Sequence, residues 1–384
     1  MKTLAPLLLG NDIPILNHDI ISAEEAFELA GNSGNLLFRS AIYKHIGRQY
    51  PQVKYGKLIK YPKSSDNLIV IPCANHLGKN SASFGANRLK NFKGIKSPMI
   101  AIGLGAQADD KHKMPQVPSD VIEWLKIIIN NAPSNYPNIS VRGSFTQEVL
   151  NNLGFENKSI VLGCPSLFIN DATNLGSIIE RNMKIWPPKR IAVSCGQPLK
   201  PKYEKIEAAL AKLVNQYNGA YIVQHPLTMI QLAKGEFSQV DKNIIEKTNK
   251  VLVPNLNQDE FFDWCKKHMR VFFDIDAWME YLRGFDFVFG TRIHGTMIAL
   301  QAGVPAVCLT HDSRTKEMCE TMKIPHIDMH QLDLENLSLE DILKQFSFDP
   351  REFDENRKSL ARKYVHFLNE NKAPVYDGLV NIAK

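Results

Sequence analysis

The strongest chemical pattern in the sequence is the block Gly290-Thr291-Arg292-Ile293-His294-Gly295. The apolar run before it predicts a buried strand, and the small residues after it predict a helix. A helix N-terminus presents unpaired N–H groups and a positive dipole end, so this turn is suited to an anion. Arg292 adds a guanidinium that matches a carboxylate or phosphate, and His294 adds a group that titrates near neutrality.

The spacing of Arg292 and His294 sets a condition on the backbone. Residues i and i+2 lie on different faces of a helix but on one face of an extended chain. The two side chains therefore converge on one ligand only if the chain stays extended through about Ile293. Thr291 is then expected to cap the helix. The alternative is a buried histidine beside a surface arginine in a salt bridge.

A second arginine occupies a similar place in the first half of the chain. Arg142 ends the apolar run 139–142, and Ser144-Phe145-Thr146-Gln147 follows with the spacing of a capping box. This pattern predicts another basic group at a helix N-terminus, facing the same cleft and helping to bind the same anion. The alternative is an arginine in a structural ion pair at a strand end.

Other polar side chains follow predicted strands or open the first clear helix. In open parallel sheets, ligands bind outside the carboxyl ends of the strands, so these side chains are candidates for substrate binding. The run 31–35 is equally consistent with a ligand turn and with a simple helix-start loop, and a solvent-exposed histidine is the alternative at position 112. The candidates are Asn32, Asn35, Asn75, Gln107, His112, Ser144 and His225.

Short apolar runs alternate with amphipathic runs along the whole chain, which predicts βαβ units and parallel sheets. Trp186-Pro187-Pro188 cannot continue a helix, and the alternation restarts at Arg190. We therefore predict two Rossmann-like α/β domains facing a cleft, residues 1–185 and 186–384. The stretch 350–371 predicts one amphipathic helix that packs on the body of the protein and could span both domains.

Strands are expected where these apolar runs are nearly continuous, as in strands buried on both faces. They fall at residues 58–61, 67–74, 98–104, 139–142, 159–162, 190–194, 220–223, 270–273, 285–289 and 305–309.

The composition excludes several classes of protein. The net charge of +6 is spread along the chain and no nucleic-acid-binding motif occurs, so we expect no nucleic-acid partner. The six cysteines are scattered without a C-x-x-C pair, and no other metal-ligand spacing occurs, so we expect neither a metal nor a cofactor. The apolar run 4–9 is too short for a signal peptide, and no run reaches the roughly 18 residues of a membrane span. We expect a cytoplasmic protein.

Three features occur together in the region 287–309: the R-x-H-G motif at Arg292, a small-residue helix after it, and Gly303-Val304-Pro305 before the last apolar run. In this combination the chain resembles the polysaccharide pyruvyl transferase family. The runs 31–35, 103–107 and 141–144 extend the resemblance over roughly residues 31–309. One departure is Gly143, where an acidic residue is expected after the arginine, which puts in doubt the ion pairing around Arg142.

The resemblance implies an architecture like that of the B-type glycosyltransferases. It also implies transfer of a pyruvyl group from phosphoenolpyruvate to a sugar of a polysaccharide or lipid-linked glycan precursor, as a ketal across two hydroxyls. Arg292 and Arg142 would bind the donor, and His294 would transfer protons, with His112 or His225 as alternatives. By their position alone, residues 84–96 and 108–116 are expected to contact the acceptor. With the basic excess, a lipid-linked acceptor predicts contact with the inner face of the membrane.

Two other functions stay open at this point. A B-type glycosyltransferase using a nucleotide sugar would share the small-residue helix and the Gly-Val-Pro block. It would usually carry a glutamate for the donor ribose on that helix, and Thr296 to Gln301 has none. A non-catalytic sugar-binding protein would not need an arginine and a histidine aimed into one cleft.

Overall fold

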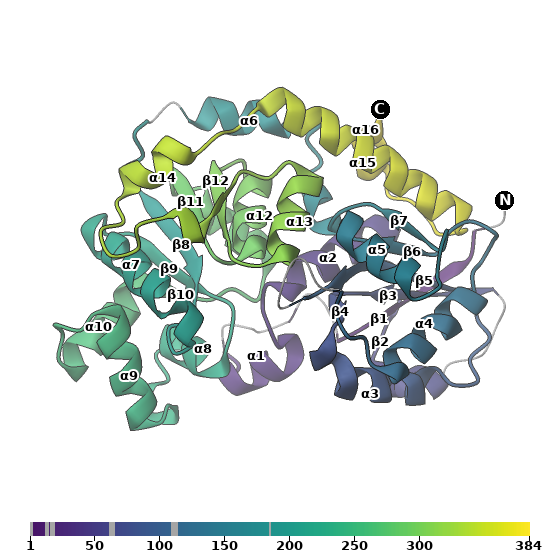
Figure 1. Ribbon diagram of the computed structural model, residues 1–384, viewed down its shortest axis with the longest axis horizontal. Helices are drawn as coiled ribbons and strands as arrows, with labels where there is room; N and C mark the ends of the chain where they lie inside the picture. The colour runs from purple at the N-terminus through teal and green to yellow at the C-terminus, as the bar shows by residue number, and fades with distance from the viewer. Residues whose placement is uncertain (1–2, 12–14, 16–19, 61–65, 109–113, 184–185) are drawn as a thin grey trace.

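Two parallel sheets organise the chain (Figure 1). The computed structural model describes residues 3–11, 15, 20–60, 66–108, 114–183 and 186–384 of the 384. All strands of the first sheet lie between residues 5 and 161, and all strands of the second lie between residues 191 and 328. The expected fold class, two Rossmann-like units with parallel sheets, is thus confirmed. The domain boundary after residue 185 falls in the interval between the sheets and stays a prediction.

The first part of the chain contains β1 (Ala5–Leu9), α1 (Ala23–Ala30), α2 (Asn35–Ile46), β2 (Gln52–Val53), η1 (Tyr55–Lys60), β3 (Asn67–Pro72), β4 (Asn75–Leu77), η2 (Lys79–Ser81), α3 (Ala82–Phe92), β5 (Met99–Ala106), α4 (Ser119–Asn130), β6 (Ile139–Val141), α5 (Ser144–Asn152), β7 (Ser159–Val161), η3 (Pro165–Phe168) and α6 (Leu175–Asn182). Its strands follow the order β2-β1-β3-β5-β6-β7, and β4 pairs with β5 outside this path.

The second part contains β8 (Ile191–Cys195), α7 (Pro201–Gln216), β9 (Ala220–Val223), α8 (Leu227–Lys234), η4 (Phe237–Gln239), α9 (Lys242–Leu252), α10 (Gln258–His268), β10 (Met269–Arg270), α11 (Ile275–Leu282), β11 (Phe287–Gly290), α12 (Ile293–Gln301), β12 (Ala306–Thr310), α13 (Ser313–Met322), β13 (His326–Asp328), η5 (Met329–Gln331), α14 (Leu339–Gln345), α15 (Pro350–Glu370) and α16 (Asp377–Ala383). Its strand order β10-β9-β8-β11-β12-β13 is that of a Rossmann sheet.

Central strands form where the apolar runs are continuous. Every residue of β5, β8, β9, β11 and β12 is buried, because helices cover both faces of each sheet. The expected strand at 58–61 is wrong: residues 55–60 form the 3-10 helix η1, and residue 61 lies outside the described residues. The run 4–9, considered above only as a possible export signal, forms the buried strand β1.

Helices far apart in the sequence join the two parts of the molecule. Helix α1 packs against α8, and Ala23 N–H donates to the carboxylate of Glu236 at 2.9 Å (Figure 1). The long α15 packs on α6 and ends beside the first sheet, where Asn371 Nδ2 donates to Pro137 O at 3.0 Å. No described helix is both long enough and apolar enough to cross a membrane.

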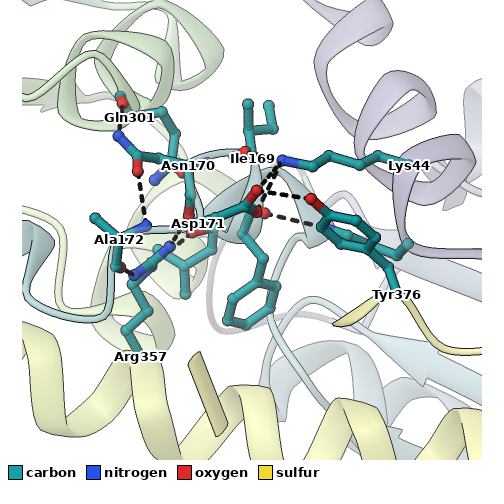
Figure 2. A network of polar contacts seen from close by, with 11 residues as sticks. Lys44, Ile169, Asn170, Asp171, Ala172, Gln301, Arg357 and Tyr376 are labelled. Atoms are coloured by element: carbon teal, nitrogen blue, oxygen red, sulfur yellow. Dashed lines mark hydrogen bonds and ion pairs between the residues drawn. The ribbon is translucent and has the colours of Figure 1, made fainter. Parts of the chain in front are cut away.

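A polar network fixes residues 167–172, which belong to η3 and the segment directly after it (Figure 2). The carboxylate of Asp171 accepts hydrogen bonds from Lys44 Nζ at 2.8 Å and from the Tyr376 hydroxyl at 2.9 Å. The Asn170 amide pairs with Gln301 of α12. Arg357 of α15 donates to three carbonyl groups of this stretch, those of Leu167, Asn170 and Ala172. We call this set the Asp171 network.

Candidate functional site

The first turn of α12 is held against the end of β8 by two glycines. Gly290 has a φ of +144°, and a Cβ there would lie 2.2 Å from Ser194 O. A Cβ on Gly295 would lie 1.8 Å from Ser194 Oγ. Arg292 N–H donates to Ser194 O at 3.2 Å. Both glycines of the R-x-H-G block therefore allow the closely packed turn that places Arg292 and His294.

Two expectations about this turn are wrong. Helix α12 begins at Ile293, and its N-cap is Arg292 in extended conformation, with no side-chain cap. Thr291 is buried and lies before the cap, so it does not cap the helix. Arg292 and His294 could share one face only if the chain stayed extended through Ile293. The chain does not, because α12 already begins at Ile293.

Arg292 and His294 consequently face different neighbours. The Arg292 guanidinium carbon lies 5.9 Å from the ring centre of Tyr203 in α7, and its buried Nε and Nη2 have no hydrogen-bond partner among the described residues. The His294 ring lies 6.0 Å from the ring of Phe38 in α2. His294 is 7% exposed, and within the described chain its Nε2 is also unpaired. Buried polar atoms are normally paired, so these atoms point to a ligand.

Arg314 lies near both Arg292 and His294, close enough for its charge to act on the histidines around them. The sequence analysis missed this residue. It lies just inside α13, after β12, and its Nη2 is 3.6 Å from the carboxylate of Asp312. Its buried Nε has no partner in the part of the chain that the structure describes. Its charge lowers the pKa of both His294 and His225. The rule that ligands bind beyond strand carboxyl ends applies equally to β12, and it would have found Arg314.

The histidines around these arginines are neutral at pH 7. Burial, and then the charges of Arg142 and Arg314, hold the pKa of His294 well below its usual value of 6.5. Burial, Arg292 and other nearby cations lower the pKa of His225 to about 3. The pKa of His311, whose ring lies 4.9 Å from Tyr203, falls to about 4, mainly because it is buried. A bound anion would offset the arginine charges but not the burial.

Arg142 is more deeply buried than the sequence suggests. It is 1% exposed, its Nε donates to Gly103 O at 2.8 Å, and its Nη2 donates to Cys73 O at 3.1 Å. Its guanidinium carbon lies 5.2 Å from the centre of the Phe38 ring, and the His294 ring lies near the same phenyl ring. Arg142 is thus held by backbone carbonyls, and its positive charge acts on His294.

The carboxylate missing at position 143 comes from another part of the chain. Glu317 of α13 accepts a hydrogen bond from Thr146 N–H at 2.8 Å and one from the Thr146 hydroxyl at 3.1 Å. A Cβ on Gly143 would lie 2.1 Å from Glu317 Cγ. The expected capping box at Ser144 is therefore wrong: Gly143 is the N-cap without a side-chain bond, and Ser144 is exposed. Glu317 also supplies the acidic charge near Arg142.

A model of the polysaccharide pyruvyl transferase family matches residues 32–313. The chain belongs to this family. The match begins in the turn before α2 and ends at the first residue of α13, so it contains Arg142, Arg292 and His294. The comparison with curated proteins gives no match.

Several solved structures are also similar to this pyruvyl transferase family member. A putative UDP-N-acetylglucosamine 2-epimerase from Listeria monocytogenes is 12% identical, with 96% of this chain and 98% of that chain covered and a TM-score of 0.47. The UDP-GlcNAc 2-epimerase from Neisseria meningitidis is 10% identical, with coverage of 99% and 98% and a TM-score of 0.45. At these values, their substrates carry no information on the substrate of this chain.

In this pyruvyl transferase family member the start of α2 lies beside the start of α12. Ser33 N–H donates to Gln224 O at 3.1 Å, and Gln224 Nε2 donates to Ser194 Oγ at 3.1 Å. Asn32 Oδ1 accepts from Gly34 N–H at 2.9 Å, which shapes the turn. The Ser33 hydroxyl is buried and unpaired within the described residues. The run 31–35 and the residue after β9 therefore border the turn that carries Arg292.

The remaining candidates fall into separate places. His225 directly follows Gln224, is half-buried, and lies 3.3 Å from Gln197 Nε2 through its Nδ1. Asn75 lies in β4 against Gly105, which also borders the Arg142 side chain, and the buried Asn75 Oδ1 is unpaired among the described residues. Gln107 is exposed just after β5. His112 lies outside the described residues, as does most of the 108–116 run expected to contact an acceptor. The structure thus brings Asn32 and His225 close to the Arg292 turn.

Proposed function

We propose that this protein transfers a pyruvyl group from phosphoenolpyruvate to a sugar of a polysaccharide or lipid-linked glycan precursor, forming a ketal. Membership of the pyruvyl transferase family supports the transferred group. The observation that carries the choice of donor is the set of unpaired buried nitrogens on Arg292, Arg314 and His294. A buried donor without a partner costs about 1–3 kcal/mol, and an anion with a carboxylate and a phosphate would supply the missing acceptors.

The proposed chemistry needs no redox step. A proton added to the methylene carbon of phosphoenolpyruvate makes C2 electrophilic, and the first sugar hydroxyl bonds to C2 and loses its proton. The bond from C2 to the phosphate oxygen then breaks. The second hydroxyl bonds to C2, and its proton leaves with inorganic phosphate. The sum is two hydroxyls and phosphoenolpyruvate giving a ketal and phosphate, with every proton accounted for.

In this proposal the arginines bind the donor and His294 transfers protons. Arg292 offers a planar fork for the phosphate or carboxylate, and Arg314 offers a second cation from the first turn of α13. His294 is neutral in the free protein, so it is in the correct form to accept a proton from a sugar hydroxyl. The negative charge of a bound donor raises the pKa of His294 and favours the protonated form that can protonate the methylene carbon. His225 is the alternative proton carrier.

The test is an assay of phosphate release from phosphoenolpyruvate with a panel of hexoses and hexose-bearing lipid acceptors. We expect acceptor-dependent release that survives exhaustive chelation, because the proposed steps use no metal. Thermal shift measurements with phosphoenolpyruvate and with UDP-hexoses add a binding readout. Stabilisation by the UDP-hexose alone would contradict the proposal and favour a glycosyltransferase. With a lipid-linked acceptor, the site of action would be the cytoplasmic face of the membrane.

A further inference from the structure

His311 directly follows β12 and is a further histidine near the arginines of the candidate site. Its side chain is 3% exposed, and its Nδ1 is buried without a partner among the described residues. The ring centres of His311 and Tyr203 lie 4.9 Å apart, and the guanidinium carbon of Arg292 lies 5.9 Å from the centre of the same Tyr203 ring. Buried polar atoms are normally paired, so the unpaired Nδ1 points to a ligand beside this arginine.

The carboxylate of Asp312 divides its two oxygens between the fold and this histidine. Oδ1 caps α13, because it accepts hydrogen bonds from the Thr315 N–H and the Thr315 hydroxyl, each at 2.8 Å. Oδ2 lies 3.5 Å from His311 Nε2 and 3.6 Å from Arg314 Nη2. Burial alone would raise the pKa of Asp312, but Arg314, His311 and the Thr315 bonds lower it to about 2, so the carboxylate is ionised at pH 7. A carboxylate beside Nε2 favours the tautomer with the proton on Nε2, which leaves a lone pair on Nδ1.

His311 is therefore ready to accept a proton. Burial lowers the pKa of its imidazole to about 4; Asp312 opposes this shift, and the charges of Arg314, Arg292 and Lys202 add to it. Arg314 and Arg292 are the side chains proposed above to bind the donor. A phosphate group held by these two arginines would lie near the His311 imidazole.

His294 and His311 have different neighbours around the same arginine. The His294 ring borders Phe38 of α2, whereas the His311 ring borders Tyr203 of α7. Beyond burial, the charge of Arg314 lowers the pKa of both histidines. One anion bound at Arg314 would thus have two separate neutral imidazoles near it, each with an unpaired ring nitrogen.

The proposed reaction has to move two protons. One is lost by the first sugar hydroxyl and is replaced by the proton that the methylene carbon gains. The other is lost by the second hydroxyl and leaves with the phosphate. The first transfer takes place at the carbon end of phosphoenolpyruvate and the second at its phosphate end, so two proton carriers in different places suit the reaction better than one.

From this arrangement we infer that His311 carries the second proton. Its Nδ1 accepts the proton of the second sugar hydroxyl as that oxygen bonds to C2. It then gives this proton to the phosphate, which has left C2 with the electron pair of the broken C–O bond. Asp312 stabilises the imidazolium that exists between the two transfers. His294 carries the first proton, and each histidine ends in the protonation state in which it began.

The test follows two signals from phosphoenolpyruvate and the hexose panel in D2O: release of phosphate, and entry of deuterium into the methylene group of recovered phosphoenolpyruvate. His311→Gln should lower kcat for phosphate release by about 10²–10⁴-fold, with little change in the donor KM. Deuterium should still enter the recovered donor, because His294 still protonates the methylene carbon and the first addition reverses. His294→Gln should lose both signals. His330→Gln, an exposed histidine of η5, is the control and should match the wild type.

Asp312→Asn tests the positioning residue. Asparagine is as good an N-cap as aspartate, so α13 and the melting temperature should be preserved. The imidazolium of His311 loses its charged partner, and we expect kcat to fall by about 10- to 100-fold, the range for a lost charge-assisted hydrogen bond. Arg314 keeps its charge, so the donor KM should change only a few-fold. Deuterium entry should continue as in His311→Gln.

The inference rests on the proposed pyruvyl transfer, and the two fail in different ways. If the wild-type protein releases no phosphate with any acceptor, the pyruvyl transfer is wrong and the role of His311 falls with it. If the wild type is active and either His311→Gln or Asp312→Asn releases phosphate at the wild-type rate, only the role of His311 is wrong. Loss of deuterium entry in His311→Gln, to the level of His294→Gln, would also overturn the inference, because His311 would then act on the first proton.

Discussion

Two regions of the molecule place buried arginines beside α12, and they differ in what those arginines contact. In the Asp171 network, Arg357 donates to three backbone carbonyls, and both Lys44 and Tyr376 reach the carboxylate of Asp171 (Figure 2). Among the residues labelled there, Gln301 Nε2 is the one buried side-chain nitrogen or oxygen without a partner in the described chain. At the other end of α12, buried nitrogens of Arg292 and Arg314 have none among the described residues.

In our proposal, this difference separates structural arginines from arginines that bind a ligand. A guanidinium whose donors all reach protein oxygens is stable without a ligand, and removing it leaves carbonyls unpaired. A guanidinium with unpaired buried nitrogens is costly to keep unless something binds to it. Arg142 lies between the two cases, since backbone carbonyls hold it while its charge still acts on His294. Substitutions in the two regions should therefore affect different measurements.

The largest effect is expected at His294. His294→Gln keeps a polar side chain of similar size, so we expect the melting temperature to change little and kcat to fall by about 10²–10⁴-fold, as for a lost acid–base group. The donor KM should change much less. Steady-state phosphate release measures both quantities. If the variant keeps the wild-type kcat, His225 rather than His294 carries the proton. His225→Gln is the matched comparison.

In the Asp171 network, Arg357→Met should act on stability. Three carbonyls lose their donor, and each buried unpaired group costs about 1–3 kcal/mol, so the free energy of unfolding should fall by about 3 kcal/mol or more. At a temperature where the variant is folded, donor affinity should stay close to the wild-type value. Urea unfolding and calorimetric titration with phosphoenolpyruvate measure the two quantities. Equal stability of variant and wild type would show that the contacts of Arg357 are not structural.

Arg314→Gln should weaken donor binding. The variant loses a cation beside the bound anion, and a charge-assisted hydrogen bond is worth about 1.5–3 kcal/mol, so we expect the donor KM to rise by roughly 10- to 100-fold. The loss of kcat should be smaller, and the melting temperature should hold. Lys316→Gln, on the exposed face of the same helix, is the control. If both variants behave alike, Arg314 has no part in the donor site.

A smaller effect is expected from exchanging the carboxylate between positions 143 and 317. Gly143→Asp alone should destabilise by about 1–3 kcal/mol, because its side chain needs the space of Glu317. Glu317→Ala alone should cost about 1 kcal/mol, since the start of α5 loses its acceptor. The double variant should recover much of both losses, because aspartate is a favourable N-cap and Gly143 is the N-cap of α5. Additive losses would contradict this exchange.

Local pattern was sufficient for most of the fold and for choosing the candidate centre of the site. Continuous apolar runs predicted β5, β8, β9, β11 and β12, since strands covered on both faces need little else. The block at 290–295 pointed to a candidate anion site, because its residue types carry the chemistry themselves, and the structure leaves buried nitrogens of Arg292 and His294 unpaired among the described residues. The run 58–61 failed as a strand because four residues give too little periodicity to separate a strand from a helical turn.

Contacts between distant segments could not be predicted from the sequence. Glu317 fills the space at Gly143, which is 174 positions away, and no local spacing indicates it. The orientation of Arg292 and His294 depended on the residue at which α12 begins, and helix ends are the least certain part of a sequence-based prediction. Arg314 is different, since it lies in the first helical turn after β12, where the strand-end rule applies.

The smallest expected effect is a pH dependence that separates His294 from His45, a histidine beside the Asp171 network. Burial, and to a lesser extent nearby cations, lower the pKa of both, to about 4 for His45. Their unfolded pKa is about 6.5, so as pH falls below this value the unfolded chain binds protons first and stability is lost through both groups. A bound donor offsets the arginine charges around His294 alone, which raises the pKa of His294 and restores part of the lost stability.

The increase in melting temperature caused by phosphoenolpyruvate should therefore be larger at pH 5.5 than at pH 7.5. In His294→Gln, the donor-induced increase in melting temperature should differ less between pH 5.5 and pH 7.5. Some difference should remain, because the donor itself, His225 and His311 also bind protons in this range. In His45→Gln it should match the wild type, since the network contacts no donor. An equal pH dependence in all three proteins would show that the donor does not bind beside His294.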